Sequence, residues 1–358
     1  MQGIAITDRH MNDRLRLTVY ATVLAITIGW VLHVGKNIFV PIVFSVLVVY
    51  VIVGLTRLLF KLPFLERFVP RQIGYVLAAL IIAFALAGIA SLLANNLGKV
   101  LALAPKYSAS LLDLIQTVAD KMGIEIAPTW TMLRQEVLAQ VSTPRLIGTT
   151  VVSVSSIASS LIIVLLYVAF LLVEQRALSA KLAKISSNPR NVAQIQKIVT
   201  HINARIGTYL ALKTLVCAVQ GVVCWAILAF FGVEFALFWA VLIGLLNYIP
   251  YIGSFVGVAL PVAFATMQFA DPKMVIAILL SLSATQFVIG FFLEPYVLGN
   301  SLNLSPFAIL ASLAIWSAIW GVAGAFLAVP ITACMALVFA EFDGTRPIAV
   351  LLSRNGDV

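Results

Sequence analysis

Charged residues are scarce in this chain: they make up 10% of its 358 residues, whereas hydrophobic residues make up 62%. Soluble domains have about 25% charged and about 45–50% apolar residues. A soluble fold of this size could not hide so much apolar surface. The composition therefore excludes a soluble secreted, disulfide-built or nucleic-acid-binding protein, and it predicts a polytopic helical membrane protein.

Cysteine and histidine are rare as well, with three of each, and no CxxC pair or Cys/His cluster occurs. We therefore expect no metal site and no cofactor. The chain also lacks a Gly-rich phosphate loop, an HExxH motif and a GxSxG motif. These absences argue against an enzyme, and the missing phosphate loop argues against a pump that hydrolyses ATP by itself.

The sequence is rich in long apolar runs, and about 20 helical residues are enough to cross a bilayer. Five runs are long, at 17–34, 38–60, 73–94, 150–173 and 207–231. Five later runs are shorter and interrupted, at 236–250, 253–270, 274–292, 306–320 and 323–340. The predicted fold is an all-α polytopic membrane protein whose C-terminal third contains broken or re-entrant segments.

Basic residues set the predicted orientation, because cytoplasmic loops are enriched in Lys and Arg. They gather before residue 17, within 57–71 and within 176–205. This pattern predicts a cytoplasmic N-terminus. Lys213 lies about two turns into a long run, and we expect its side chain to snorkel to the lipid headgroups.

The apolar runs and the basic residues together divide the chain into predicted segments. Residues 1–94 are predicted to form a transmembrane scaffold, 150–173 a further transmembrane helix and 341–358 a cytoplasmic tail. Residues 95–149 are expected to form an external helical insertion, with a helix from Pro105 to Gly123, that acts as a packing lid or gates substrate. Residues 174–206 read as a cytoplasmic amphipathic helix beginning at Asn188-Pro189, which meets lipid headgroups or a partner. Residues 207–340 are predicted to form the transport unit.

Three breaks interrupt the apolar runs of this predicted transport unit. Pro250 and Gly253 lie in the first break, Pro295 and Gly299 in the second, and Gly321, Gly324 and Pro330 in or beside the third. Proline removes a helical hydrogen bond and glycine permits unusual dihedral angles. Within a membrane such breaks are tolerated where they are packed in protein or line a wet cavity, and transporters use them to hold substrate.

Polar side chains beside the breaks are the candidate functional residues. Glu294 is the candidate ion-coupling residue, because a carboxylate buried in an apolar setting can exchange protons; the alternative is a solvated helix-end carboxylate. Candidate substrate-binding residues are Asn247, Tyr248, Ser254 and Gln286, whose side chains could form hydrogen bonds with a small polyhydroxylated ligand. The alternative for Gln286 is a helix–helix hydrogen bond.

These motifs resemble the signature of the autoinducer-2 exporter family. The resemblance rests on residues 246–253 (LNYIPYIG), 292–299 (FLEPYVLG) followed by 304–306 (LSP), and 321–324 (GVAG) with 328–332 (AVPIT). Residues 209–214 (YLALKT) and the insertion after the third run also fit. The sequence departs from the family pattern at Ser254, where proline is frequent, and at Ser305, where histidine is common.

The resemblance implies a bacterial inner-membrane protein with about eight transmembrane helices, both termini in the cytoplasm, and assembly into homo-oligomers, with pentamers known in the family. It implies a transporter, and family members are associated with export of the quorum-sensing signal autoinducer-2. Together with the residues, it leads us to expect a secondary transporter that exports a small polar metabolite, with autoinducer-2 as the first candidate and proton coupling through Glu294. A sodium/proton antiporter and a passive pore or membrane scaffold are the alternatives. The expected partners are a small-molecule substrate, membrane lipid and further copies of the chain, with no nucleic acid.

Overall fold

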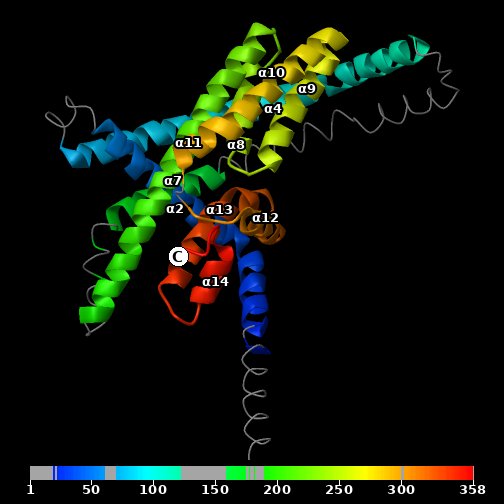
Figure 1. The fold of residues 1–358 in the computed structure, drawn as a ribbon. Helices are drawn as coiled ribbons and strands as arrows, with labels where there is room; N and C mark the ends of the chain where they lie inside the picture. Colours follow the sequence, from blue (N-terminus) through cyan, green and yellow to red (C-terminus); the bar gives the residue numbers. More distant parts are fainter. Residues whose placement is uncertain are drawn as a thin grey trace, which may run out of the picture.

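A computed structural model describes residues 19–20, 22–60, 70–121, 159–174, 177, 181, 189–299 and 302–357. Within these ranges the chain is almost entirely helical, and its one extended pairing is an isolated bridge between Leu304 and Ser353. The labelled helices are α2 (Lys36–Leu59), α4 (Arg71–Lys121), α7 (Pro189–Phe230), α8 (Ala236–Leu246), α9 (Ile252–Phe269), α10 (Pro272–Val288), the π-helical turn η1 (Ile289–Leu293), α11 (Glu294–Leu298), α12 (Pro306–Trp320), α13 (Val322–Ala340) and α14 (Arg346–Leu352). The predicted all-α membrane fold is confirmed (Figure 1).

Six helical segments of the described chain are long and apolar enough to cross a membrane. They are Lys36–Arg57, Ile73–Val100, Val192–Phe230, Ile252–Phe269, Pro272–Leu298 and Val322–Ala340. Four apolar helices are shorter, namely Thr22–Val34, Ser159–Glu174, Ala236–Leu246 and Pro306–Trp320. Each predicted apolar run therefore has a helical counterpart, although α8, at 11 residues, is only about 16 Å long and cannot span a bilayer alone.

The helix start predicted at Pro105 and the start of the span predicted at residue 207 both fall inside continuous helices. Helix α4 runs unbroken from Arg71 to Lys121, so the predicted helix start at Pro105 is wrong, and residues 122–149 lie outside the described part of the chain. Helix α7 begins at Pro189, as the sequence predicted, and continues without interruption into the following span. Proline suits the first turn because it lacks the N–H that a helix start leaves unused.

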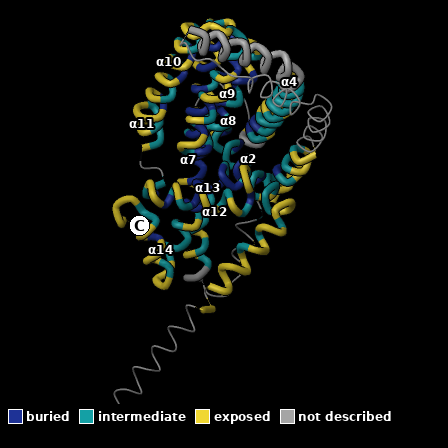
Figure 2. The backbone as a smooth tube through the Cα atoms, turned by 90° about the vertical axis from the view of Figure 1, so that its right-hand side faces the viewer, coloured by how far each residue is buried: buried dark blue, intermediate teal, exposed yellow. Residues whose placement is uncertain are grey.

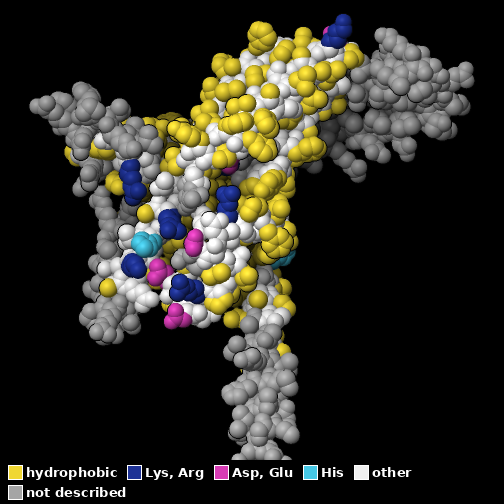
Figure 3. All heavy atoms as spheres, in the orientation of Figure 1, with side chains coloured by type: hydrophobic (Ala, Val, Ile, Leu, Met, Phe, Trp, Pro, Cys, Tyr) yellow, Lys and Arg dark blue, Asp and Glu magenta, His cyan; other side chains and the backbone are white. Residues whose placement is uncertain are grey.

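Helix α7 is the central element of the fold. It packs against α2, α8, α10, α11 and α13. Figure 2 shows buried residues concentrated in the middle of the molecule, where these helices meet, and exposed residues along α10, α11 and α14. On the face shown in Figure 3, charged side chains gather low, around the first half of α7 and α14, while hydrophobic side chains cover the upper part.

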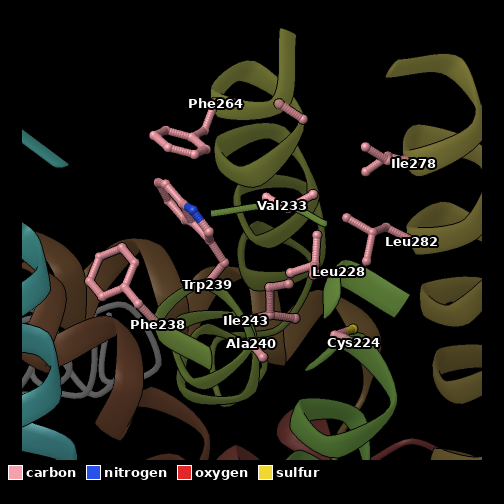
Figure 4. Close-up of a cluster of buried hydrophobic side chains, with 11 residues drawn as sticks. Cys224, Leu228, Val233, Phe238, Trp239, Ala240, Ile243, Phe264, Ile278 and Leu282 are labelled. Atoms are coloured by element: carbon pink, nitrogen blue, oxygen red, sulfur yellow. The ribbon is translucent and has the colours of Figure 1, made fainter. Parts of the chain in front are cut away.

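A buried apolar cluster joins the far end of α7 to α8, α9 and α10 (Figure 4). We call it the Trp239 cluster; its members are Cys224, Leu228, Val233, Phe238, Trp239, Ala240, Ile243, Phe264, Ala265, Ile278 and Leu282. Leu228, Ile278 and Leu282 are each fully buried. The cluster therefore forms a continuous apolar layer across this end of the helix bundle.

Two of the turns in the C-terminal third depend on a glycine. In the α8–α9 hairpin, a Cβ at Gly253 would lie 1.8 Å from the Leu246 carbonyl oxygen. In the α12–α13 hairpin, a Cβ at Gly324 would lie 1.8 Å from the Trp316 carbonyl oxygen, and Gly321 has φ +64°. Residues 306–340 thus form two helices joined at Gly321, and Pro330 lies inside the second without ending it.

The predicted break at Pro295 is a local distortion instead. The helix that begins at Pro272 passes through η1 and α11 to Leu298. Just before Pro295, the backbone N–H of Glu294 donates to the carbonyl of Ile289, five residues earlier, which is a π-helical bond. A π-helical turn can accommodate the proline at this point, and the helix ends at Gly299, which has φ +50°.

Candidate functional site

A cavity of about 790 Å³ lies between α7, the α8–α9 turn, the α10–α11 segment and the C-terminal segment. Its wall contains residues from the first two predicted breaks and from the loop before α12. The predicted site residues that line it are Asn247, Pro250, Ser254, Gln286, Glu294, Pro295 and Gly299. Tertiary structure thus brings together polar residues that are up to 47 positions apart between Asn247 and Glu294.

An ion pair occupies the cavity wall. The Lys213 Nζ atom on α7 lies 2.5 Å from the Glu294 Oε1 atom on α11. The Lys213 side chain is 3% exposed and the Glu294 side chain is 27% exposed. The predicted snorkelling of Lys213 is therefore wrong: its ammonium group points inward, because a carboxylate 81 positions away offers it a partner.

The inward orientation of the Lys213 side chain could have been predicted from the sequence by a simple rule. An ionisable residue inside an apolar run faces the interior of a helix bundle more often than lipid, and it usually has a partner. Glu294 is the carboxylate of the C-terminal third that lies against an apolar run. To predict that Lys213 pairs with Glu294, one would need to know which residues of α7 and α11 lie opposite each other, and the sequence alone does not show this.

Tyr248 does not line the cavity, contrary to its prediction as a substrate-binding residue. Its hydroxyl lies 2.5 Å from the Thr214 hydroxyl on α7. Its ring stacks on Phe326 of α13, with ring centroids 4.5 Å apart. Tyr248 therefore joins the α8–α9 turn to α7 and to the second hairpin.

Two further polar contacts lie along α7. The Asn247 amide nitrogen lies 3.7 Å from the sulfur of Cys217. The Gln220 Nε2 atom donates to the Gln286 Oε1 atom at 2.8 Å, which agrees with the helix–helix alternative for Gln286. Gln220 is fully buried and was not among the predicted residues.

The C-terminal segment forms part of the cavity wall. Arg354 lines the cavity, and its backbone N–H donates to the carbonyl of Asn303 at 3.1 Å. The Ser305 N–H donates to the carbonyl of Leu352 at 2.9 Å, while the Ser305 hydroxyl accepts from Ala308 and caps α12. These bonds hold residues 302–305 against the end of the chain. Arg354 was not predicted from the sequence, because nothing local links the tail to this loop.

Other predicted residues have structural positions away from the cavity. Gly253, Gly321 and Gly324 lie at the hairpin turns, and Pro330 is buried in α13. Among the described residues, no group of three or more His, Cys, Asp or Glu side chains could hold a metal ion.

Comparison with known proteins agrees with this architecture. Residues 20–343 match the AI-2E family of transporters. Over 293 residues the chain is 29% identical to "AI-2 transport protein TqsA" of Escherichia coli (strain K12), covering 80% of this chain and 82% of that protein. It is 28% identical over 295 residues to "Putative transport protein YhhT" of the same strain, covering 81% and 82%.

A third relative, a "Putative transport protein" of Borreliella burgdorferi, is 33% identical over 198 residues, which is 55% of this chain and 54% of that protein. The family match spans most of the chain, from the first described helix to the end of α13. It includes every helix that lines the cavity. This multi-pass membrane protein therefore belongs to the AI-2E family of transporters.

Proposed function

We propose that the protein is a secondary transporter that exports a small, hydroxylated polar metabolite, with autoinducer-2 as the first candidate. The observation that carries the proposal is the cavity, which combines amide and hydroxyl groups at Asn247, Ser254 and Gln286 with one ion pair. Such groups can bind several hydroxyls in an otherwise apolar site. The relative named as an autoinducer-2 transport protein supports the choice of first substrate.

The ion pair supports proton coupling. Protonation of Glu294 would remove its attraction to Lys213 and so free two helices, α7 and α11, to move relative to each other. The alternative is a sodium/proton antiporter, in which sodium, like a proton, would compete with the Lys213 ammonium group for the Glu294 carboxylate.

We further propose an inner-membrane location, with both termini in the cytoplasm, and assembly into a homo-oligomer, with a pentamer as the first candidate. Charged side chains gather around the first half of α7 and α14, which supports a cytoplasmic position for that end (Figure 3). Under this orientation the part of the cavity wall that contains Arg354 lies toward the cytoplasm. Native mass spectrometry from lipid nanodiscs would measure the number of copies.

The test of function is efflux of autoinducer-2 from proteoliposomes with and without an imposed pH gradient. The variants are Glu294→Gln and the double variant Lys213→Met/Glu294→Gln, which removes both charges and leaves none unpaired. The control is Glu341→Gln, because Glu341 also faces a basic partner, His201 at 4.0 Å, outside the cavity.

We expect gradient-stimulated efflux from the wild type and the control, and efflux insensitive to the gradient from the double variant. A double variant that still responds to the gradient would contradict coupling through this pair. Absence of autoinducer-2 efflux from well-assembled wild type would contradict the proposed substrate, and the same vesicles would then be tested for sodium-driven proton movement.

A further inference from the structure

The contact between α7 and α10–α11 changes in character along its length. At the cavity end lies the ion pair of Lys213 and Glu294. Two helical turns farther along α7, Gln220 faces Gln286. One turn beyond this amide pair, the two helices enter the Trp239 cluster through Cys224 and Leu282, and Leu228 and Ile278 follow (Figure 4). The amide pair therefore lies between the polar cavity and the apolar layer.

Two facing amide groups can form two hydrogen bonds with each other, and this pair forms one of them. Gln220 Nε2 donates to Gln286 Oε1. The Gln220 Oε1 atom and the Gln286 Nε2 atom are both buried, and neither has a hydrogen-bond partner among the described residues. Buried amide groups are rarely left unpaired, because desolvation without a partner is costly. One carbonyl oxygen and one amide nitrogen, with its two N–H groups, thus remain without a partner on two facing side chains.

A hydroxyl group complements this pair of atoms. It donates one hydrogen bond and accepts others, so a single hydroxyl can satisfy an acceptor and a donor at once. A methyl group or a hydrogen atom at the same place would satisfy neither. Gln286 lines the cavity and Gln220, which is fully buried, lies directly behind it, so a ligand can reach the pair from the cavity when the Gln286 side chain moves aside.

We propose that Gln220, together with Gln286, binds one hydroxyl of the transported compound behind the cavity wall, between the cavity and the Trp239 cluster. This inference rests on the proposed function. It narrows the substrate class to compounds with a hydroxyl at the end that reaches the Gln220–Gln286 pair. Gln220 is a specificity-determining residue in this proposal. A compound without that hydroxyl leaves the Gln220 Oε1 and Gln286 Nε2 atoms without a partner and is transported less efficiently.

The experiment compares the wild type with Gln220→Met, which keeps the length of the side chain and removes both amide atoms. Efflux kinetics are measured for autoinducer-2 and for analogues in which one hydroxyl at a time is replaced by hydrogen. The matched control is Gln268→Met. Gln268 makes two hydrogen bonds, to the Glu234 N–H at 2.8 Å and to the Gly232 carbonyl at 2.9 Å, and it lies outside the cavity.

We expect the wild type and Gln268→Met to prefer autoinducer-2 over one deoxy analogue by about tenfold in kcat/KM, and Gln220→Met to lose that preference. If Gln220→Met lowers efflux of every compound equally, or changes nothing, the pair is a structural contact or is filled by water, and the inference is wrong.

A second measurement separates this inference from the proposed function. If the wild type does not export autoinducer-2, thermal unfolding is measured in glycerol and in erythritol. General solvent effects of these polyols are shared by the wild type and Gln268→Met. If polyol raises the unfolding temperature of Gln220→Met less than that of the wild type and of Gln268→Met, the hydroxyl site is supported even though the substrate is not autoinducer-2. Equal stabilisation of all three proteins overturns it.

Discussion

Removing one partner of the Lys213–Glu294 pair is predicted to destabilise the protein unequally, depending on which partner is removed. Glu294→Gln leaves the Lys213 ammonium group, at 3% exposure, without an anion. Lys213→Met leaves the Glu294 carboxylate, at 27% exposure, beside the cavity, where water can reach it. The double variant leaves no charge.

The magnitude follows from the geometry. At 2.5 Å the direct attraction is about 7 kcal/mol for an effective dielectric constant of about 20, and desolvation of both groups offsets most of it. Stranding a buried charge costs about 3–5 kcal/mol, so we expect a loss of about 3 kcal/mol or more for Glu294→Gln. For Lys213→Met we expect about 1–2 kcal/mol, and for the double variant a stability within about 1 kcal/mol of the wild type.

The assay is reversible unfolding in mixed detergent micelles, followed by tryptophan fluorescence and by helical circular dichroism. The double-mutant cycle isolates the pair, since each single variant removes the same contact. Equal losses for the two single variants would contradict the burial argument. Additive losses in the double variant would contradict the ion pair itself.

Three further predictions test the hairpins, the α7 contact and the tail. Gly324→Ala should abolish stable assembly, measured as the monodisperse yield on size-exclusion chromatography, because its Cβ would meet a carbonyl oxygen at 1.8 Å, whereas Gly257→Ala, with its nearest atom at 3.6 Å, should assemble normally. Tyr248→Phe should cost about 1 kcal/mol of unfolding free energy, and the double variant with Thr214→Val should lose less than the sum of the two single losses, because both single variants break the bond between the two hydroxyls while Thr214→Val also removes the bond to the Leu210 carbonyl. Deletion of residues 346–357 should release the loop before α12 and speed its cleavage by protease, while unchanged cleavage would show that the bonds to the tail do not hold it.

The helices were predictable from the sequence because their causes are local. About 20 consecutive apolar residues form a helix in a membrane wherever they occur, since every backbone polar group must be satisfied within the segment. The start of α7 at Pro189 and the turn glycines Gly253 and Gly321 follow from the backbone limits of proline and glycine. Pro295 shows the limit of this reasoning, because a π-helical turn accommodated a residue expected to break the helix.

The candidate site was predictable only in part. Asn247, Ser254, Gln286 and Glu294 line the cavity because polar residues beside breaks avoid lipid, as their sequence setting indicated. Tyr248 packs away from it, and Arg354 reaches it from the end of the chain. The direction in which a side chain points depends on how neighbouring helices are rotated, which a hydrophobic run does not encode.

Sequence alone determined that this chain is a helical membrane protein with a polar, interrupted C-terminal third, because composition and run length decide which solvent a segment can enter. Only the tertiary structure decided that Lys213 faces Glu294 and that Gln220 faces Gln286. These pairs join residues 81 and 66 positions apart. Their register follows from the antiparallel packing of whole helices, to which many distant side chains contribute at once.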